Sequence, residues 1–229
     1  MLPRLTEHVE RVLVVAPHAD DEVLGCGGLL ARLAARGCRP HILYLAVDGF
    51  HHYGLEHPTT YEQRLAEIEA VTRLLGCSWE ICYGDRGLIE KLDTLPKREL
   101  VDLFEAAFNR HQPELLLLPS GADYDQGHLA VFQAGFAAAR PIAPAFGKCL
   151  IPHVFTYEMT KLNWTAGCLP HPVAYCDITD QLATKLQALR LYATQIRGNP
   201  HIRSVESVTA LAEIRGKEVA VHYAEAFAI

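Results

Sequence analysis

The chain has 229 residues, half of them hydrophobic, which is enough for residues 1–229 to form a single domain with its own core. A formal net charge of −6, without a block of lysines or arginines, argues against nucleic acid as a partner. Seven cysteines without a C-x-x-C pair predict reduced thiols and a cytoplasmic protein, and no apolar run is long enough for a signal core or a membrane anchor.

Strand-like and helix-like segments alternate along the chain. The expected strands are residues 12–16, 41–47, 79–83, 115–118, 154–157 and 173–178. The expected helices cover residues 24–36, 60–75 and 205–214, and further helices begin near residues 94–96, 128 and 180. This alternation predicts an α/β fold of the Rossmann-like, three-layer type, in which helices cover both faces of a mostly parallel sheet.

Glycines and apolar spacing refine these helices. Gly37 and Gly76 are expected to end the first two. His128 lies four residues before an apolar position, so it is expected on the inward face of the first turn of its helix. The residues expected to share that helix's apolar face are Phe132, Gly135, Phe136 and Ala139.

Polar residues gather after two of the expected strands. His18, Asp20 and Asp21 follow the first strand, and a second group follows the fourth, namely Asp123, Asp125 and His128. If the strand order is 3-2-1-4-5, these two strand ends are neighbours at the point where the order reverses. Doubly wound sheets bind their ligands in the crevice at that point, so both groups are expected to face one site.

The residue types in this site are suited to a hydrolytic zinc ion. His18 and Asp21, at positions i and i+3, can bind from one side of a first helical turn, and His128 can supply a third ligand. Zinc held by three protein ligands keeps a position for water, whose pKa it lowers to about 7. Asp20 is then the candidate general base, and Glu22 is expected to brace the turn.

The same residues identify a family resemblance. Pro17-His18-Ala19-Asp20-Asp21-Glu22, followed by Leu24-Gly-Cys-Gly-Gly28, resembles the signature of the PIG-L/LmbE-like family of zinc-dependent N-deacetylases. Later segments resemble further family motifs in the same order: Arg64-x-x-Glu67, residues 123–128, Tyr192-Ala-Thr-Gln195 and residues 215–227.

This resemblance implies a hydrolase that removes the N-acetyl group from an N-acetylated amino sugar or from its glycoside or conjugate. It implies one zinc ion held by His18, Asp21 and His128, with Asp20 as the general base. It also implies that Arg64 lies near the substrate. The expected partner is therefore a small amino-sugar molecule, and whether the chain forms a homo-oligomer is left open.

The second motif departs from the family pattern, which is commonly H-x-D-H. Here it is Asp125-Gln-Gly-His128, so the ligand histidine is present and Asp125 stands where the family has its upstream histidine. That histidine is credited with stabilising the oxyanion or protonating the leaving group, and an ionised carboxylate cannot donate a hydrogen bond. A backbone N–H, the hydroxyl of Tyr124, or a histidine from elsewhere, His222 or His52, could replace it.

Structural roles are the alternatives for each candidate. His18 and His128 could be ordinary histidines that bond the ends of a strand and a helix. Asp123 and Asp125 could cap the helix instead of binding substrate with Tyr124. The remaining alternatives are an exposed Arg64–Glu67 ion pair and a solvated loop around His51, His52 and His57. Gly25-Cys-Gly-Gly28 lacks dinucleotide-loop spacing, and close packing of a helix on the sheet explains it better.

Other functions remain as alternatives. The same site could hydrolyse a different acyl amide or a thiol-sugar conjugate. A protein that binds metal or sugar with little or no turnover is a second alternative, because Asp125 replaces the family histidine. A nucleotide-dependent Rossmann enzyme is a third.

Overall fold

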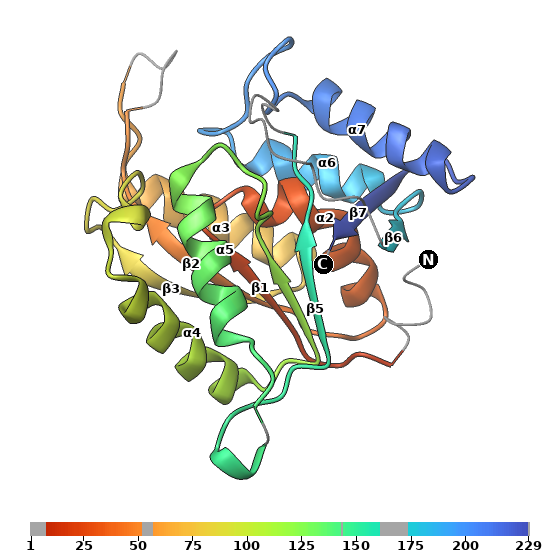
Figure 1. The fold of residues 1–229 in the computed structure, drawn as a ribbon. Coiled ribbons are helices and arrows are strands. Elements are labelled where there is room, and N and C mark those ends of the chain that lie inside the picture. The colour runs from red at the N-terminus through yellow and green to blue at the C-terminus, as the bar shows by residue number, and fades with distance from the viewer. Residues whose placement is uncertain (1–7, 52–56, 143, 161–173, 229) are drawn as a thin grey trace.

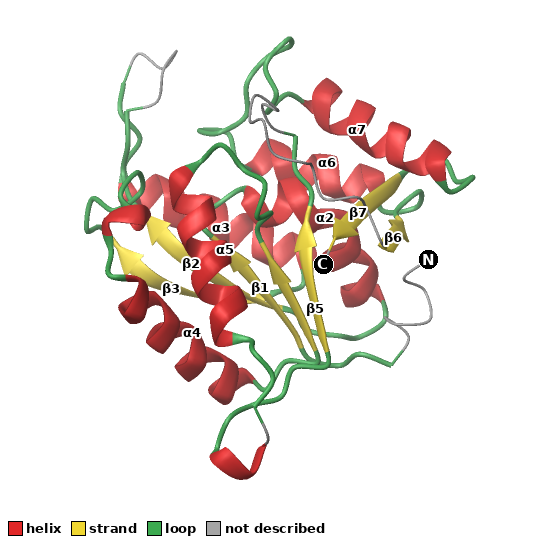
Figure 2. Cartoon of the chain, in the orientation of Figure 1, coloured by secondary structure: helices red, strands yellow, loops and turns green. Residues whose placement is uncertain are grey.

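The computed structural model describes residues 8–51, 57–142, 144–160 and 174–228. Its strands form one sheet in the order β3-β2-β1-β4-β5-β7-β6 (Figures 1 and 2). Five strands are parallel, whereas β7 pairs antiparallel with both β5 and β6. The strands are β1 (Val12–Ala16), β2 (His41–Val47), β3 (Ser78–Gly84), β4 (Leu115–Leu118), β5 (His153–Tyr157), β6 (Ala174–Asp177) and β7 (Ala224–Ala228).

Helices cover both faces of this sheet, as Figure 1 shows. The α-helices are α2 (Asp21–Ala35), α3 (Tyr61–Leu75), α4 (Lys97–His111), α5 (Gln126–Ala138), α6 (Leu182–Leu191) and α7 (Val205–Glu218), and two short 3₁₀ turns are η1 (Leu92–Thr94) and η2 (Pro144–Phe146). One hydrophobic cluster joins the sheet to α2, α3, α6 and α7, and the other joins it to α4 and α5. The three-layer α/β prediction is confirmed.

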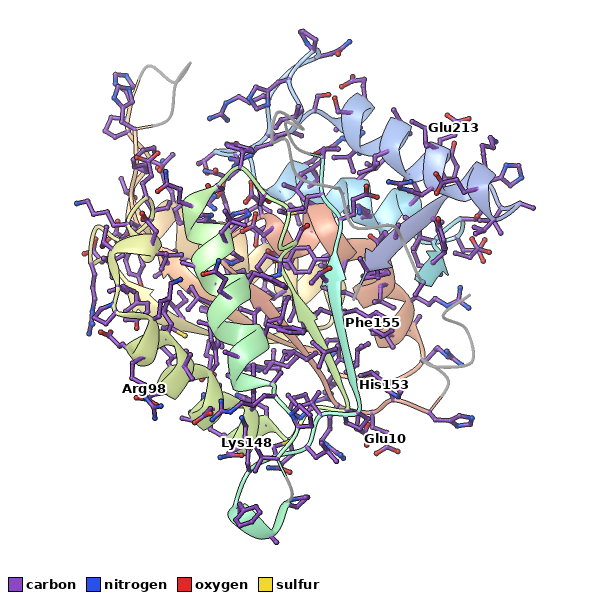
Figure 3. All side chains as sticks on the ribbon, in the orientation of Figure 1. Glu10, Arg98, Lys148, His153, Phe155 and Glu213 are labelled. Carbon is purple, nitrogen blue, oxygen red and sulfur yellow. The ribbon has the colours of Figure 1, made fainter. Side chains whose placement is uncertain are left out.

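The central strands explain why the sheet is buried on both faces. Along β1, Val12, Val14 and Ala16 enter one cluster, while Leu13 and Val15 enter the other. A continuous apolar run is what a parallel strand between two helical layers requires. Charged side chains such as Arg98 and Glu213 project from the outer surfaces of α4 and α7 (Figure 3).

The strand order 3-2-1-4-5, on which the expectation of a shared site depended, is that of the first five strands of the sheet. The order reverses between β1 and β4, whose ends are neighbours through the pairs Val12–Leu115 and Val14–Leu117. The strand β7 was not predicted, because no Asn, Asp or Gly directly before Ala224 marks a turn into it. Tertiary pairing with β5 and β6 makes Ala224–Ala228 a strand.

The predicted apolar face of α5 is wrong at Phe136, which is 50% exposed and stacks on Phe132 at the surface. The helix is rotated so that its small residues face the sheet. A Cβ on Gly135 would lie 2.7 Å from the Leu118 side chain, so glycine allows α5 to approach β4 closely. His128 is 6% exposed, which confirms its place on the inward face.

Helix α2 contains a kink at Cys26, where φ is −143° and ψ is 19°. The kink frees backbone groups that a buried ion pair satisfies. Glu225 accepts from the N–H groups of Gly28 and Leu29, both at 2.8 Å, and Lys185 Nζ donates to Leu24 O at 2.9 Å. Lys185 and Glu225 pair at 2.6 Å. The second part of α2 is thus capped by β7, which fixes the helix that follows the first polar motif.

Close packing explains the glycines of α2, as predicted. A Cβ on Gly25 would overlap the ring of Tyr157, and one on Gly28 would lie 2.5 Å from Ile178. Separately, none of the helices among the described residues is long and apolar enough to cross a membrane.

Candidate active site

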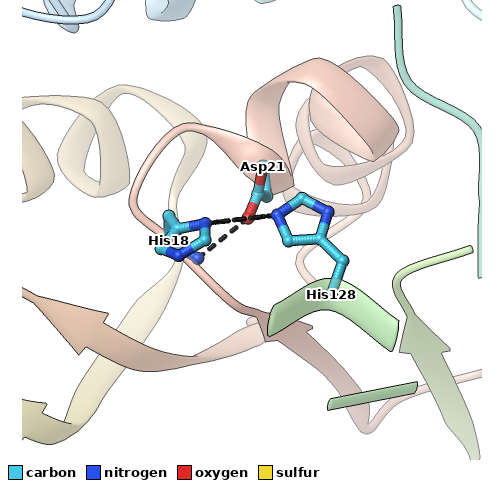
Figure 4. A group of neighbouring side chains, drawn as sticks. All are labelled: His18, Asp21 and His128. Carbon is cyan, nitrogen blue, oxygen red and sulfur yellow. Dashed lines mark hydrogen bonds and ion pairs between the residues drawn. The ribbon is translucent and has the colours of Figure 1, made fainter. Parts of the chain in front are cut away.

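The site lies where β1 and β4 end, at the reversal point of the sheet. A tight loop joins β1 to α2 and carries His18, while Asp21 is the first residue of α2. His128 comes from the first turn of α5, after β4. The structure brings these three side chains together (Figure 4), and each offers one atom within 4.8 Å of the others.

The distances between these atoms fit a metal ion. His18 Nδ1 and His128 Nε2 are 3.2 Å apart, and they lie 3.6 Å and 3.4 Å from Asp21 Oδ2. Ligands that bind a tetrahedral zinc ion at about 2.0–2.1 Å are separated by about 3.4 Å. Three donor atoms already stand at that spacing, and the remaining tetrahedral position can accept water.

Hydrogen bonds orient the imidazole rings of His18 and His128. In each ring, the nitrogen without such a bond faces the Asp21 carboxylate. His18 Nε2 donates to the carbonyl of Ile89 at 2.6 Å, which leaves Nδ1 with its lone pair. His128 Nδ1 bonds Asp123 Oδ2 at 3.1 Å, which leaves Nε2 for a ligand. Metal-binding histidines in proteins are held by such partners on the other ring nitrogen.

Asp48 supports the carbonyl that orients His18. It is 2% exposed at the end of β2, and its carboxylate accepts from three successive N–H groups, those of Gly87, Leu88 and Ile89, at 2.8–3.0 Å. The loop that carries the Ile89 carbonyl is therefore fixed by a buried charge. Nothing in the local sequence around Asp48 indicated this role, because the contact joins two distant loops.

Electrostatics favour an anionic Asp21. Burial alone would raise the pKa of Asp21, but the charges and hydrogen bonds of His128 and His18 hold it well below its usual range. Burial would likewise lower the pKa of His128, yet Asp21 and Asp123 raise it well above the ordinary value. The site thus attracts a positive charge at its centre, either a proton or a metal ion.

Asp20 is held in a strained backbone conformation beside the three converging side chains. Its φ of 141° is rare outside glycine, and it is fixed by bonds to the peptide groups on its N-terminal side. The Arg64 guanidinium donates to the Ala19 carbonyl, and the Asp20 N–H donates to Glu22 Oε2 at 3.2 Å. The predicted bracing role of Glu22 is confirmed by this bond.

One carboxylate oxygen of Asp20 is buried without a hydrogen bond to any described residue and faces Arg203. Asp20 Oδ2 is buried and has no hydrogen-bond partner among the described residues, and Arg203 Nη1 lies 3.5 Å from it. Burial raises the pKa of Asp20, while Arg203 opposes that shift. An unsatisfied buried acceptor with a raised pKa is suited to take up a proton.

Arg64 is 2% exposed and lies under the loop, not on an exposed helix face. Besides Ala19, it contacts Glu67 and donates to Thr194 Oγ1 at 2.8 Å. Glu67 in turn accepts from the Thr194 N–H at 2.7 Å. These contacts rule out an exposed ion pair and favour a supporting role for Arg64, and its predicted contact with substrate stays a prediction.

The three residues before α5 differ in their roles. Asp123 is 4% exposed and orients His128, as described above. Asp125 is the N-cap of α5, where its Oδ1 accepts from the His128 N–H at 3.1 Å, so the capping alternative holds for this residue. Tyr124 is 47% exposed, and burial of part of its ring raises the pKa of the phenol.

The structure offers a cation that the sequence analysis missed, Arg203. Its guanidinium reaches Asp20 from the segment before α7, and interaction with Asp20 raises the pKa of this arginine. Arg203 belongs to none of the sequence motifs and lies 75 residues after His128, so its position near the site depends on the fold. Of the histidines proposed to replace the missing one, His222 is exposed next to Tyr223, and His52 lies outside the described residues.

Asp123 allows a direct test of how the ligand is held. We expect Asp123→Asn to weaken zinc binding about 10- to 100-fold, because His128 loses an anionic partner. Asp125→Asn is the matched control, since asparagine caps a helix as well as aspartate does. Competition titration against a chelator measures both affinities. Equal affinities in the two variants would contradict the role of Asp123.

Comparisons with known proteins match the part of the chain that carries these residues. The family model of the GlcNAc-PI de-N-acetylases (PIG-L) matches residues 13–139, a range that includes His18, Asp21 and His128. A relative from Mycobacteroides abscessus, 1D-myo-inositol 2-acetamido-2-deoxy-alpha-D-glucopyranoside deacetylase, is 23% identical over 81% of this chain and 81% of its own.

Two solved structures show similar folds. The conserved protein TT1542 from Thermus thermophilus is 27% identical, with a TM-score of 0.75 over 96% of this chain and 94% of that chain. GalB, the 4-carboxy-2-hydroxymuconate hydratase from Pseudomonas putida, is 23% identical, with a TM-score of 0.72 over 95% of both chains. The second match concerns the fold alone.

Proposed function

The chain belongs to the GlcNAc-PI de-N-acetylase (PIG-L) family, and from this premise we propose that it is a zinc-dependent N-deacetylase of an N-acetylated amino sugar, its glycoside or its conjugate. The observation that carries the proposal is the triangle of His18 Nδ1, Asp21 Oδ2 and His128 Nε2, with sides of 3.2, 3.4 and 3.6 Å. Asp20 Oδ2 beside it, which has no hydrogen bond among the described residues, is proposed as the proton-transfer group.

The three ligands fit one divalent cation, which when bound supplies Lewis acidity that lowers the pKa of a water to about 7 and polarises the amide carbonyl. Asp20 takes a proton from the attacking water as the new C–O bond forms. It then passes that proton to the departing nitrogen as the C–N bond breaks, so the products are acetate and a free amine. Positioned proton transfer of this kind contributes about 10²- to 10⁴-fold to the rate.

Arg203 is proposed to take over the role of the missing histidine. Asp125 caps α5 and cannot donate to an oxyanion, whereas the Arg203 side chain is 31% exposed and stays charged at every working pH. Its Nη1 lies 3.5 Å from Asp20 Oδ2. We therefore assign Arg203 to stabilise the negative charge that develops on the carbonyl oxygen.

We expect Arg203→Met to lower kcat about 10²- to 10³-fold, the loss seen when one oxyanion donor is removed. Arg203 also lowers the pKa of Asp20, so its removal should move the acid limb of the kcat/KM profile to higher pH. Steady-state kinetics across pH measure both effects. Arg190→Met, on an exposed position of α6, is the control. Unchanged kinetics in Arg203→Met would refute the assignment.

The reaction class is tested by product analysis. Zinc-loaded protein is incubated with N-acetylglucosamine, N,N′-diacetylchitobiose and a GlcNAc-inositol, together with N-propionyl analogues and a cysteinyl-sugar amide. The proposal expects acetate and free amine in equal amounts from at least one N-acetylated sugar. Release of another acyl group alone would favour the amidase alternative. Normal zinc binding without any amine would favour a binding protein or a water-adding enzyme.

A further inference from the structure

A second cluster of side chains that could bind a metal lies at the opposite end of the strands. His41 is the first residue of β2, and Glu80 lies near the start of β3, paired with Leu43 of β2. His111 is the last residue of α4. These positions are at the amino ends of the parallel strands, whereas the candidate active site lies beyond their carboxyl ends. The cluster is therefore separate from the site already described.

The cluster converges on one oxygen. Glu80 Oε1 lies 3.2 Å from His111 Nε2 and 3.7 Å from His41 Nε2. The two rings stack with centroids 4.1 Å apart, and both Nε2 atoms lie beside the same Glu80 oxygen. Each residue offers one donor atom within 4.8 Å of the others. The spacing to Glu80 is close to the separation of about 3.4 Å between ligands of a tetrahedral zinc ion.

The hydrogen bonds of His41 leave its Nε2 without a hydrogen-bond partner among the described residues. Its Nδ1 is 2.9 Å from Ser78 Oγ, and that hydroxyl has the Pro40 carbonyl as its own acceptor, at 3.4 Å. When the Ser78 hydroxyl donates to Pro40, it accepts from Nδ1–H, and this tautomer leaves the lone pair on Nε2. His41 Nε2 is buried without a hydrogen-bond partner among the described residues. A metal ion is a ligand that would satisfy this nitrogen.

Arg110 competes for the same carboxylate. Its guanidinium contacts Glu80 Oε1, and its Nε lies 3.4 Å from His111 Nε2. The Arg110 side chain is 57% exposed, so it can leave Glu80 and remain solvated. The ligand side chains are only 17–34% exposed, so they stay in place when it does. Displacing this arginine lowers the affinity of the cluster below that of an unopposed site.

We propose that His41, Glu80 and His111 form a second divalent-metal site, with two imidazole nitrogens and one carboxylate oxygen as zinc-type ligands. The bound ion ties the end of α4 to β2 and β3, at the edge of the sheet away from the catalytic residues. Because this site shares no ligand with the proposed active site, either can fail without the other.

The test counts zinc ions bound after equilibrium dialysis of four proteins. We expect two per chain in the wild type, one in His111→Ala, one in His128→Ala, and none in the double variant. His111→Ala should keep its acetate release, which also shows that it folds. A zinc count that His111→Ala does not lower relative to the wild type would overturn the proposal. A zinc count that His128→Ala does not lower would instead count against the deacetylase site.

Arg110→Gln tests the competition without altering a ligand. Removing the charged partner of Glu80 should tighten the second site about two- to fivefold, as expected for loss of one competing, largely exposed ion pair. Calorimetric zinc titration in the His128→Ala background isolates this site. Unchanged affinity in Arg110→Gln would contradict the proposed geometry, because the ion and the guanidinium could not then share Glu80.

Discussion

Asp20→Asn is expected to lower kcat by about 10²- to 10⁴-fold while zinc binding stays close to that of the wild type. Asparagine keeps the size of the side chain but cannot accept a proton at neutral pH. The Asp20 carboxylate is not one of the three converging donors, and among the described residues its Oδ2 makes no hydrogen bond and one ion pair, with Arg203 at 3.5 Å. Acetate release and zinc content, measured on the same samples, check both parts of this expectation.

The matched control for this variant is Asp102→Asn, an exposed aspartate of α4 that pairs with Arg98 on the surface. It changes the same functional group far from the site, and we expect its kcat to equal that of the wild type. If Asp20→Asn retained more than a tenth of the wild-type rate, another group would have to move the proton. If it lost its zinc, Asp20 would belong to the ligand set instead.

His128→Ala is expected to abolish both activity and the catalytic zinc. This ring supplies one of three donors and is bonded on both sides, by Asp21 at 3.4 Å and by Asp123 at 3.1 Å. Losing the ion removes several kcal/mol of charge stabilisation, which corresponds to about 10³-fold or more in rate. Zinc content and acetate release measure the two losses.

His111→Ala is the control for the loss of a histidine, because it removes an imidazole from the opposite edge of the sheet. We expect its acetate release to match that of the wild type. Circular dichroism melts establish that both variants fold. Activity in His128→Ala at the wild-type level would contradict the assignment of this residue as a ligand.

Much of the sheet could be predicted because its strands are short apolar runs with clear boundaries. The bounds of β1, β2 and β4 agree with the prediction, since Leu and Val runs end at Pro17, Asp48 and Pro119. The strand β7 could not be predicted, because Ala-Glu-Ala-Phe-Ala has weak strand propensity and owes its conformation to its neighbours.

The site could be predicted where its residues are close in sequence, and not where they are joined only by the fold. His18 and Asp21 lie in one motif, and the order of the strands places His128 opposite them. The supports of these residues come from distant loops: Asp48 acts through the Ile89 carbonyl, and Arg203 reaches Asp20 from the segment before α7. Such contacts depend on tertiary structure and leave no local pattern in the sequence.

The side of α5 that faces the sheet could not be predicted from hydrophobicity. Hydrophobicity favoured Phe136 as a core residue, yet close packing against Leu118 selects the side of the helix that carries Gly135 and Ala134. A short distance between a helix and a sheet excludes large side chains, so the smallest residues face inward. The spacing of apolar residues along a helix does not reveal how closely that helix will pack on the sheet.

The most direct measurement of the central claim is acetate release before and after removal of the metal. Protein stripped with a chelator should release no acetate from its best N-acetylated sugar, and one equivalent of zinc bound through His18, Asp21 and His128 should restore the activity. The same addition to His128→Ala should restore nothing. Full acetate release by the stripped protein, or equal recovery in His128→Ala, would contradict a zinc-dependent reaction at this site.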